Sequence, residues 1–315
     1  QGSVSILVVV HASMVALVVG GTGYVGQFVI QALRARDLEV HATHRAGREP
    51  TGLPVEVPCH CMDFTDAEGM ATVLREVAPR VVVNCAAMSA LGACEKDPQA
   101  ATAANCPRGL VEAIAREAGS SPRLFVHFST DIVFDGDPAQ VYDEDSAPKP
   151  LNAYGRSKAE FDAFLAERSE PTCVVLRPTN IVGPRHPYCS TGTKFLQWLD
   201  GRLRTDETTK LFEDEFRHYV WVEDLVEVVA KLVEAFPEEM PPCRLLHCGG
   251  PEALNRVDVA RALAAAKGYA PSYRAEEGGA ELARVAATPR AEVDLGYPSP
   301  LCVRFRSARA EAFLG

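Results

Sequence analysis

The sequence lacks the features that would indicate a metal site or a nucleic-acid surface. No two of its 10 cysteines form a C-x-x-C pair, and no group of histidines and cysteines has the spacing of zinc ligands. Acidic residues outnumber basic ones, so the formal net charge is −10 and the isoelectric point lies near 5.4. No run of like charge marks an interaction tail. We therefore expect no metal and no nucleic-acid partner, because nucleic-acid surfaces carry excess positive charge.

We expect neither a membrane-spanning nor a secretory segment in the N-terminal residues. The apolar stretch 5–10 is too short to cross a bilayer, and no positively charged segment precedes it. Cysteines such as Cys85 and Cys173 lie in apolar, strand-like runs, which favours reduced thiols. Cys59-His60-Cys61 could bind a metal, but a strand edge is the favoured interpretation. We expect an intracellular, cytoplasmic protein without a membrane partner. An organelle stays open, because the leader 1–13 before Met14 could be a remnant of expression, a trimmed transit segment or an edge strand.

A glycine-rich turn joins a predicted strand to a predicted helix near the N-terminus. The apolar run Val15–Val19 predicts a buried parallel strand, and apolar spacing predicts a helix over 27–36. Between them Gly20 allows a tight turn, Gly23 lets the backbone approach a pyrophosphate, and Gly26 allows close helix packing. The free N–H groups at the helix start would face phosphates. The pattern predicts a dinucleotide site; the alternative is a glycine-rich turn without a ligand.

The end of the next predicted strand, 38–43, bears on the choice of cofactor. An acidic residue there would bind the ribose hydroxyls of NAD, and the sequence has His44 and Arg45 instead. A cation suits the 2′-phosphate of NADP. We expect NADP(H) to be preferred over NAD(H), the alternative for Arg45 being a solvated loop cation.

Strand and helix patterns alternate up to Gly183 and then become irregular. We predict strands over 55–59, 80–85, 124–129 and 172–176, and helices over 66–77, 99–118 and 153–166. This alternation is typical of an α/β fold with a doubly wound parallel sheet. Later we predict helices over 193–199, 216–236, 255–266 and 307–313, and a strand at 244–248 that returns to the sheet. The expected domains are a cofactor domain, 1–178, and a smaller substrate lobe, 179–315.

Three side chains could assist the reduction of a carbonyl by a hydride donor. Tyr154 and Lys158 are four residues apart on a predicted helix, so they share a face, and Thr130 follows a predicted strand. Adding hydride to a carbonyl creates an alkoxide that needs a proton donor. We expect the ammonium of Lys158 to lower the pKa of Tyr154, its donor, while Thr130 binds the carbonyl oxygen. The alternative is a plain surface pair at 154 and 158.

Five motifs carry a resemblance to a known family: Ser129-Thr130-Asp131, 133–136, the acidic loop 142–145, 152–158 and 222–225. The chain resembles an extended short-chain dehydrogenase/reductase, and more narrowly the RmlD family of dTDP-4-dehydrorhamnose reductases, from Val15 to about Leu295. Segments 83–87 and 94–98 are most similar to plant proteins related to the methionine adenosyltransferase regulatory (beta) subunit.

The resemblance implies a Rossmann sheet, a smaller C-terminal lobe and an NADP(H) site. It implies catalytic roles for Thr130, Tyr154 and Lys158, and substrate contacts for Thr130, Asp131 and Arg217. Asp63 would hold the adenine amino group; otherwise it is a residue at a helix start. Besides Tyr154, Lys158 and Asp63, the implied cofactor contacts are Gly20, Thr22, Gly23, Tyr24, Val25, Gly26, His44, Arg45, Phe64, Cys85, Ala86, Ala87, Asn105, Ser129, Pro178, Thr179, Asn180 and Ile181.

Two departures bear on the substrate. The R-P-x-x-x-x-L-D pattern of RmlD-like reductases is only loosely matched by Pro289-Arg290 and Val293-Asp294, and 185–215 matches no deoxysugar site. The leading interpretation is an NADPH-dependent reductase of a 4-keto nucleotide sugar. One alternative is a non-catalytic NADP-binding regulatory subunit that partners methionine adenosyltransferase. Another is a nucleotide-sugar epimerase or dehydratase, in which Arg217 binds the sugar diphosphate or is an ordinary salt bridge. The oligomeric state stays open.

Overall fold

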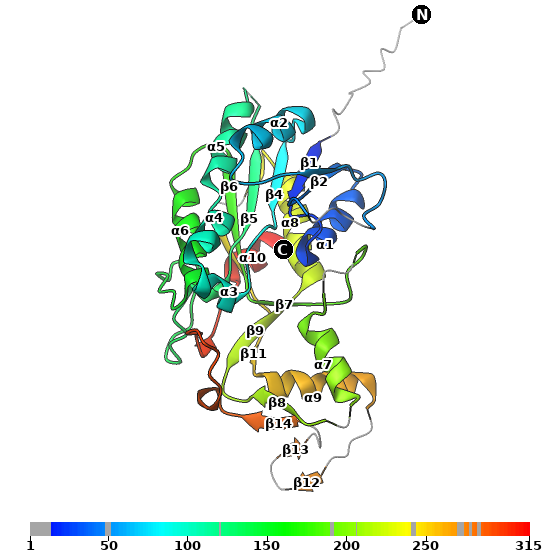
Figure 1. Cartoon of the computed structure of the whole chain (residues 1–315), viewed down its shortest axis with the longest axis vertical. Helices are drawn as coiled ribbons and strands as arrows, with labels where there is room; N and C mark the ends of the chain where they lie inside the picture. The colour runs from blue at the N-terminus through cyan, green and yellow to red at the C-terminus, as the bar shows by residue number, and fades with distance from the viewer. Residues whose placement is uncertain are drawn as a thin grey trace, which may run out of the picture.

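The computed structural model describes residues 14–47, 52–119, 121–189, 192–205, 207–240, 244–269, 274–276, 279–281 and 285–315, so the predicted leader lies outside the described residues. A parallel sheet forms the centre of the larger half (Figure 1). Its order is β10-β6-β5-β4-β1-β2-β3, where the strands are β1(Val15–Val19), β2(Glu39–His44), β3(Cys59–Cys61), β4(Val81–Asn84), β5(Leu124–Phe128), β6(Thr172–Pro178) and β10(Leu245–Cys248). This order confirms the predicted doubly wound fold.

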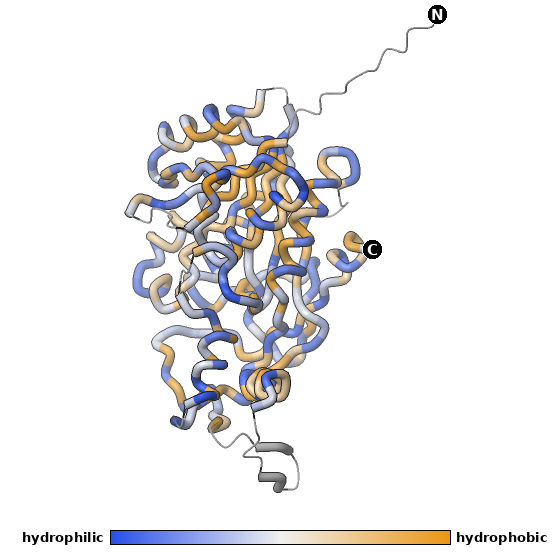
Figure 2. The backbone as a smooth tube through the Cα atoms, turned by 90° about the vertical axis from the view of Figure 1, so that its right-hand side faces the viewer, coloured by the Kyte–Doolittle hydropathy of each residue, from blue (hydrophilic) through white to orange (hydrophobic). Residues whose placement is uncertain are grey.

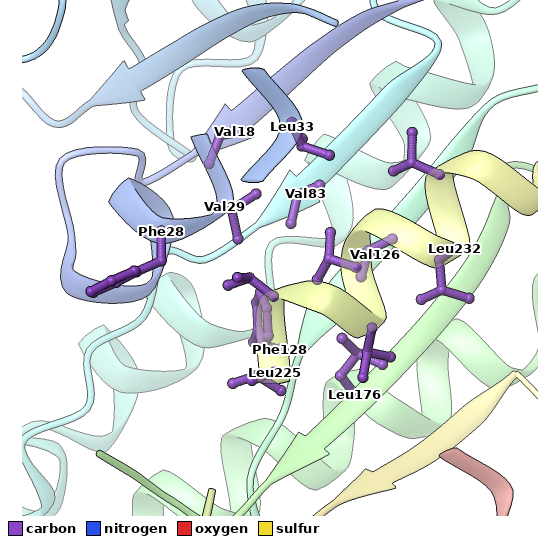
Figure 3. Packing of buried hydrophobic residues seen from close by; sticks show 14 of the residues in the cluster. Val18, Phe28, Val29, Leu33, Val83, Val126, Phe128, Leu176, Leu225 and Leu232 are labelled. Atoms are coloured by element: carbon purple, nitrogen blue, oxygen red, sulfur yellow. The ribbon is translucent and has the colours of Figure 1, made fainter. Parts of the chain in front are cut away.

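Helices cover both faces of the sheet, because successive strand residues point to opposite sides. On one face Val18 and Val126 pack against α1(Tyr24–Arg34) and α8(Val222–Ala235), with α10(Ala308–Leu314) beside them. Figure 3 shows α1 and α8 meeting over these strands. The side chains of Leu17 and Phe125 point to the other face, toward α2(Ala67–Val77), α5(Arg108–Glu117) and α6(Ala153–Ala166). Strands buried on both faces explain the continuous apolar runs in the sequence.

A smaller lobe lies at the lower end of the sheet (Figure 1). It contains the set β11-β9-β15, with β7 paired to β9, and the parallel pair β14-β8. The bounds are β7(Asn180–Val182), β8(Thr209–Phe212), β9(Phe216–Trp221), β11(Ala253–Leu254), β14(Val285–Thr288), β15(Cys302–Val303), α7(Phe195–Leu203) and α9(Arg256–Lys267). Short elements complete the fold: α3(Leu91–Lys96), α4(Pro98–Asn105), β12(Arg274–Glu276), β13(Gly279–Glu281) and the 3-10 turns η1(Asp131–Val133) and η2(Arg290–Glu292).

Three predicted elements are wrong in extent. The helix predicted over 99–118 is two helices, α4 and α5, because Pro107 has no N–H to continue the first one. The strand predicted over 55–59 lies at Cys59–Cys61 instead. Val57 donates its N–H to the Pro54 carbonyl in a turn, and the exposed Val55 lies in that turn. The helix predicted over 216–236 begins only at Val222, because 216–221 pairs as β9 with strands on both sides.

The chain returns to the sheet after the small lobe has begun. Helix α8 packs on α1, and β10 pairs with β6 through Leu245↔Val175 and the next three residues. Apolar segments gather along the sheet in Figure 2, with hydrophilic segments outside. No helix in the described part of the chain is long and apolar enough to cross a membrane. The predicted domain division at residue 178 stays a prediction. Helix α8 and strand β10 come after this position in the sequence but pack with the sheet of the larger half.

Candidate active site

One edge of the sheet collects most of the predicted site segments. Strands β1, β4, β5 and β6 are parallel neighbours, and their last residues pair across the sheet, as Val19↔Asn84, Asn84↔His127 and Phe128↔Leu176 do. The residues that follow these strands therefore leave at the same carboxyl edge. Segments 20–26, 85–87, 129–131 and 178–181 lie together there.

The glycine positions of the turn after β1 leave little or no room for a Cβ. Gly20 has φ +73°, and a Cβ there would lie 2.9 Å from the backbone of Ala86. A Cβ on Gly26 would lie 2.5 Å from the Gly20 carbonyl oxygen, and one on Gly23 would lie 3.1 Å from it. Helix α1 begins after Gly23 with no side-chain cap and no acid in its first turn. The N–H groups at the start of α1 are therefore not capped by a side chain of the described residues, so the turn fits a phosphate group.

A loop of the small lobe is bonded onto this turn, which the sequence did not predict. The fully buried Gln27 side chain donates to the carbonyls of Thr22 (2.9 Å) and Cys189 (2.8 Å). Its carbonyl oxygen accepts the N–H groups of Tyr188 and Cys189. The hydroxyl of Tyr24, whose ring is buried, donates to the Pro184 carbonyl at 2.9 Å. A glutamine on the apolar face of a predicted helix was the available signal. Val25 is half-buried on the same helix.

The end of β2 carries the predicted cation. His44 is buried and its Nδ1 lies 3.1 Å from the Arg45 carbonyl oxygen, while Arg45 itself is exposed. Asp63 is exposed and accepts hydrogen bonds from the N–H and hydroxyl of Thr65. These bonds, and then the charge of Arg45, hold the pKa of Asp63 below its ordinary value. The charges of Arg45 and Asp63 therefore interact. Phe64, which follows Asp63 in the sequence, is half-buried against the core.

The loop after β4 is supported from below. Cys85 and Ala86 are half-buried and Ala87 is exposed. Asn105 is fully buried: its oxygen accepts the Met88 N–H at 2.8 Å, and its amide nitrogen donates to the Met88 carbonyl and to Ser157 Oγ. All of these polar bonds are internal to the protein. The structure therefore places the Asn105 side chain under the loop, where it fixes the loop's path.

The three predicted catalytic side chains lie together at the edge. Tyr154 and Thr130 are both buried, and the Thr130 side chain lies close enough to Tyr154 to oppose part of the effect of burial on the Tyr154 pKa. Burial raises the pKa of Tyr154 above its ordinary value, so the predicted lowering by Lys158 is wrong. The physical reason is that desolvation penalises the phenolate, while Lys158 Nζ faces the Phe128 carbonyl, at 2.7 Å, and not the phenol. Tyr154 is therefore protonated at neutral pH.

Lys158 is almost completely buried, which lowers its pKa to about 8, an effect opposed in part by the charge of Asp162. Its Nζ lies 3.3 Å from Nε2 of His127, a buried histidine of β5. The sequence analysis missed His127; a histidine inside the apolar run Leu124–Phe128, just before Ser129 and Thr130, was the available signal.

Two buried arginine–aspartate pairs flank the edge. Arg217 of β9 donates to Asp131 at 3.0 Å and to the Pro300 carbonyl at 2.8 Å, so the ordinary salt bridge is the interpretation of Arg217 that the contacts match. Arg177 donates to Asp162 at 2.9 Å, and the Ser129 hydroxyl donates to the same carboxylate oxygen at 2.8 Å. Asp131 and Ser129, predicted to contact substrate and cofactor, are thus bonded within the protein.

The segment after β6 and the cysteine-rich strand complete the predicted positions. Pro178 ends β6, and Thr179 is buried with no hydrogen-bond partner for its hydroxyl among the residues that the structure describes. Asn180 is exposed and Ile181 half-buried on β7. Cys59-His60-Cys61 forms β3, the edge strand of the sheet. Among the described residues, no three His, Cys, Asp or Glu side chains group as metal ligands.

Comparison with known proteins identifies the family of this chain. Residues 14–309 match the family described as the RmlD substrate binding domain. A probable low-salt glycan biosynthesis reductase of Haloferax volcanii is 33% identical over 204 residues, 64% of this chain and 65% of that protein's own length. The dTDP-4-keto-6-deoxy-D-glucose reductase of Streptomyces niveus is 30% identical over 69% of this chain and 68% of its own. The beta subunit of methionine adenosyltransferase 2 of Xenopus laevis is 24% identical over 79% of this chain and 71% of its own.

Solved structures share the fold across nearly the whole chain. A dTDP-4-dehydrorhamnose reductase of Clostridium acetobutylicum superposes with a TM-score of 0.75 at 21% identity, covering 96% of this chain and 93% of its own. The Bacillus anthracis dTDP-4-dehydrorhamnose reductase in complex with NADP gives 0.71 at 18% identity, covering 94% and 91%. The Thermus thermophilus UDP-glucose 4-epimerase in complex with NAD gives 0.74 at 24% identity, covering 95% and 92%.

Proposed function

Because the chain belongs to the RmlD substrate binding domain family of extended short-chain dehydrogenases/reductases, we propose that it is an NADPH-dependent reductase of a 4-keto nucleotide sugar. The observation that carries the proposal is that the buried Thr130 and Tyr154 lie at the sheet edge from which the glycine-rich turn leaves, with Lys158 one helical turn from Tyr154. A proton donor, a hydroxyl that can bind a carbonyl oxygen and a phosphate-binding turn lie at one sheet edge.

The residues present fit a dinucleotide cofactor. The N–H groups at the start of α1 would hold the pyrophosphate, and the exposed Arg45 would hold a 2′-phosphate. The small residues of the loop 85–87 would let the backbone lie against the cofactor. When bound, the cofactor supplies the hydride. The preference for NADP(H) rests on Arg45 and on the missing acid at the end of β2, since structural relatives were solved with NADP and with NAD.

The chain's own groups account for the proton transfer and the alignment of the carbonyl. Thr130 donates a hydrogen bond to the carbonyl oxygen, and Tyr154 donates its phenolic proton as negative charge develops there. The raised pKa of Tyr154 keeps it protonated at neutral pH, which is the form that a donor requires. Lys158 would hold the nicotinamide ribose. The sugar would lie between this edge and the lobe that begins at residue 179.

A substrate screen tests the proposal. NADPH oxidation is followed with nucleotide-linked 4-keto sugars, and Tyr154→Phe should lower kcat by about 10²–10⁴-fold while NADPH binding stays nearly unchanged. The matched control is Tyr269→Phe, which also removes a hydroxyl, but from a tyrosine that contacts Asp200 and Arg204 in the small lobe. Turnover preserved in Tyr154→Phe would refute the role of Tyr154 as the proton donor. If none of the sugars supports NADPH oxidation, the proposed substrate class is refuted.

A regulatory role is the second candidate, favoured by one observation. The match to the Xenopus beta subunit covers 79% of this chain, more than the matches to the two reductases described above. Lys158 and Tyr154 could then serve cofactor binding without proton transfer. A pull-down with methionine adenosyltransferase separates the two candidates. A stable complex without oxidation of any sugar supports the regulatory role, whereas turnover of one sugar that is lost in Tyr154→Phe supports the reductase.

A further inference from the structure

A column of three buried polar side chains lies behind the proposed active site. Asn84 ends β4, His127 is its register partner on β5, and Lys158 comes from α6. Each is at most 1% exposed. The imidazole of His127 packs edge-on against Phe161, with 4.7 Å between ring centroids, and lies parallel to Phe125. The ring is therefore held in one orientation and excluded from water.

A backbone group sets the direction of the hydrogen bonds in this column. The Ala86 N–H lies 3.1 Å from the Asn84 side chain, and a backbone N–H can only donate. The amide atom that faces it is therefore the oxygen Oδ1. The Asn84 NH₂ group then faces His127 Nδ1 at 3.1 Å and must donate to it. It follows that Nδ1 of His127 carries no hydrogen.

The remaining hydrogen of the neutral imidazole must then be on Nε2, which faces Lys158 Nζ at 3.3 Å. Burial lowers the pKa of His127 well below its ordinary value, which agrees with a neutral ring. An ammonium group has no lone pair to accept the Nε2–H. A neutral amine can accept this bond and still donate to the Phe128 carbonyl at 2.7 Å.

The other groups around Lys158 do not reverse this conclusion. Burial raises the pKa of each of the three nearby thiols, Cys85, Cys94 and Cys106, so they are uncharged at neutral pH. Asp162 of the same helix favours a charged lysine, but its Oδ2 accepts bonds from Arg177 and Ser129, and among the described residues no donor, Lys158 included, bonds to its Oδ1.

We propose that His127 is a positioning residue whose Nε2–H tautomer, imposed by Asn84, favours the neutral amine form of Lys158 over the ammonium in the ligand-free protein. The inference rests on the proposed function only in assigning Lys158 to the active site. Lys158 can gain a proton only if its bond to His127 is given up. Because Asn84 also binds Ala86, the charge on Lys158 is coupled to the loop 85–87, where the cofactor is expected. The pKa of Lys158, near 8, makes the neutral amine the main form above about pH 8, whereas an ordinary lysine stays charged up to about pH 10.4.

Nuclear magnetic resonance on the ligand-free full chain tests the proposal without any turnover. With ¹⁵N-labelled histidine, long-range ¹H–¹⁵N spectra distinguish the two neutral tautomers. The His127 signal, assigned by its loss in His127→Gln, should show the Nε2–H form. Its shift should also change with an inflection near pH 8, the pKa of Lys158, and that inflection should vanish in Lys158→Met. An Nδ1–H tautomer, or an inflection that survives in Lys158→Met, would overturn the proposal.

The substitution Asn84→Asp should reverse the direction of the hydrogen bonds that join residue 84, His127 and Lys158. A carboxylate can only accept, so it requires a hydrogen on Nδ1 of His127. Nε2 is then free to accept a hydrogen bond from a Lys158 ammonium. The Lys158 inflection should therefore move up by a pH unit or more, toward the ~10.4 of an ordinary lysine. The matched control is Asn255→Asp at the N-cap of α9, where aspartate caps equally well and His127 should not change. An unchanged tautomer or inflection in Asn84→Asp would refute the coupling. If that variant does not fold, the wild-type tautomer and inflection still decide. None of these results depends on finding a substrate.

Discussion

Two regions of the same sheet edge differ in what forms them: one consists of backbone groups and the other of buried polar side chains. After β1 the site consists of backbone: Gly20 and Gly26 have no space for a Cβ, and α1 begins without a side-chain cap. Behind β5 it consists of buried polar side chains that bond to one another, among them Lys158, His127 and Asp162. The first arrangement leaves N–H groups free for a ligand, whereas the second leaves few polar atoms free and fixes their orientation.

The comparison shows where each end is vulnerable. The turn should be disrupted by adding atoms, and the polar cluster by removing them. An added Cβ meets backbone that cannot move aside, whereas a removed partner leaves a charge buried without compensation.

The largest effect is expected at the Asp162–Arg177 pair. Asp162→Ala leaves the Arg177 guanidinium, 4% exposed, without its carboxylate and removes the acceptor of Ser129. Such a change typically lowers the free energy of unfolding by about 3–5 kcal/mol. Urea denaturation at neutral pH measures it.

An exposed ion pair provides the control for Asp162. Glu56→Ala removes the partner of Arg34 at the surface, where the two side chains are 64% and 34% exposed. Solvent screens such pairs, so the free energy of unfolding should change little. Equal losses in the two variants would contradict the idea that burial makes the Asp162 pair sensitive.

A glycine pair tests the opposite end. Gly20 and Gly268 both have positive φ, 73° and 62°, but a Cβ on Gly268 would meet no atom of the described residues within 4 Å. Alanine at either position should cost about 1–2 kcal/mol from backbone strain. At Gly20 the contact with Ala86 should add about 1–3 kcal/mol and weaken NADPH binding. The two free energies of unfolding and the NADPH Kd check this, and equal destabilisation would contradict the close-packing argument.

The same contrast explains what the sequence could predict. The turn was predicted with its glycines because its residues lie within one short segment, and Tyr154 and Lys158 were predicted because four residues make one helical turn. The bonds of Lys158 involve residues distant in the chain, such as His127, so no local spacing reveals them. The raised pKa of Tyr154 depends on burial, which a motif does not report.

The small lobe was predicted least well, for a related physical reason. Residues 216–221 lead directly into the helical pattern of α8, and only pairing with β7, β11 and β15 makes them a strand. Arg217 lies in that strand, where the contact with Asp131, 86 positions away in sequence, determines its partner. Tertiary pairing overrides local preference in such short strands.

The smallest effect is expected at Arg45, where the turn meets the exposed end of β2. If Arg45 binds the 2′-phosphate, Arg45→Ala should cost about 1–3 kcal/mol of NADPH binding, the range of charge-assisted hydrogen bonds, and leave NADH binding unchanged. Fluorescence titration with both cofactors measures the two affinities. Because Arg45 is exposed, the NADPH contribution should shrink as salt rises.

Asp63 is the neighbour that sharpens the Arg45 prediction. Its carboxylate feels the charge of Arg45, so Asp63→Asn removes a competing anion and should strengthen NADPH binding slightly. If Asp63 instead holds the adenine, the same substitution should weaken NADPH and NADH to a similar extent, because both carry that base. Equal or tighter binding of NADH by the wild-type protein would contradict the predicted preference. If Arg45→Ala weakens the binding of NADPH and NADH to the same extent, Arg45 supports the turn and does not bind the 2′-phosphate.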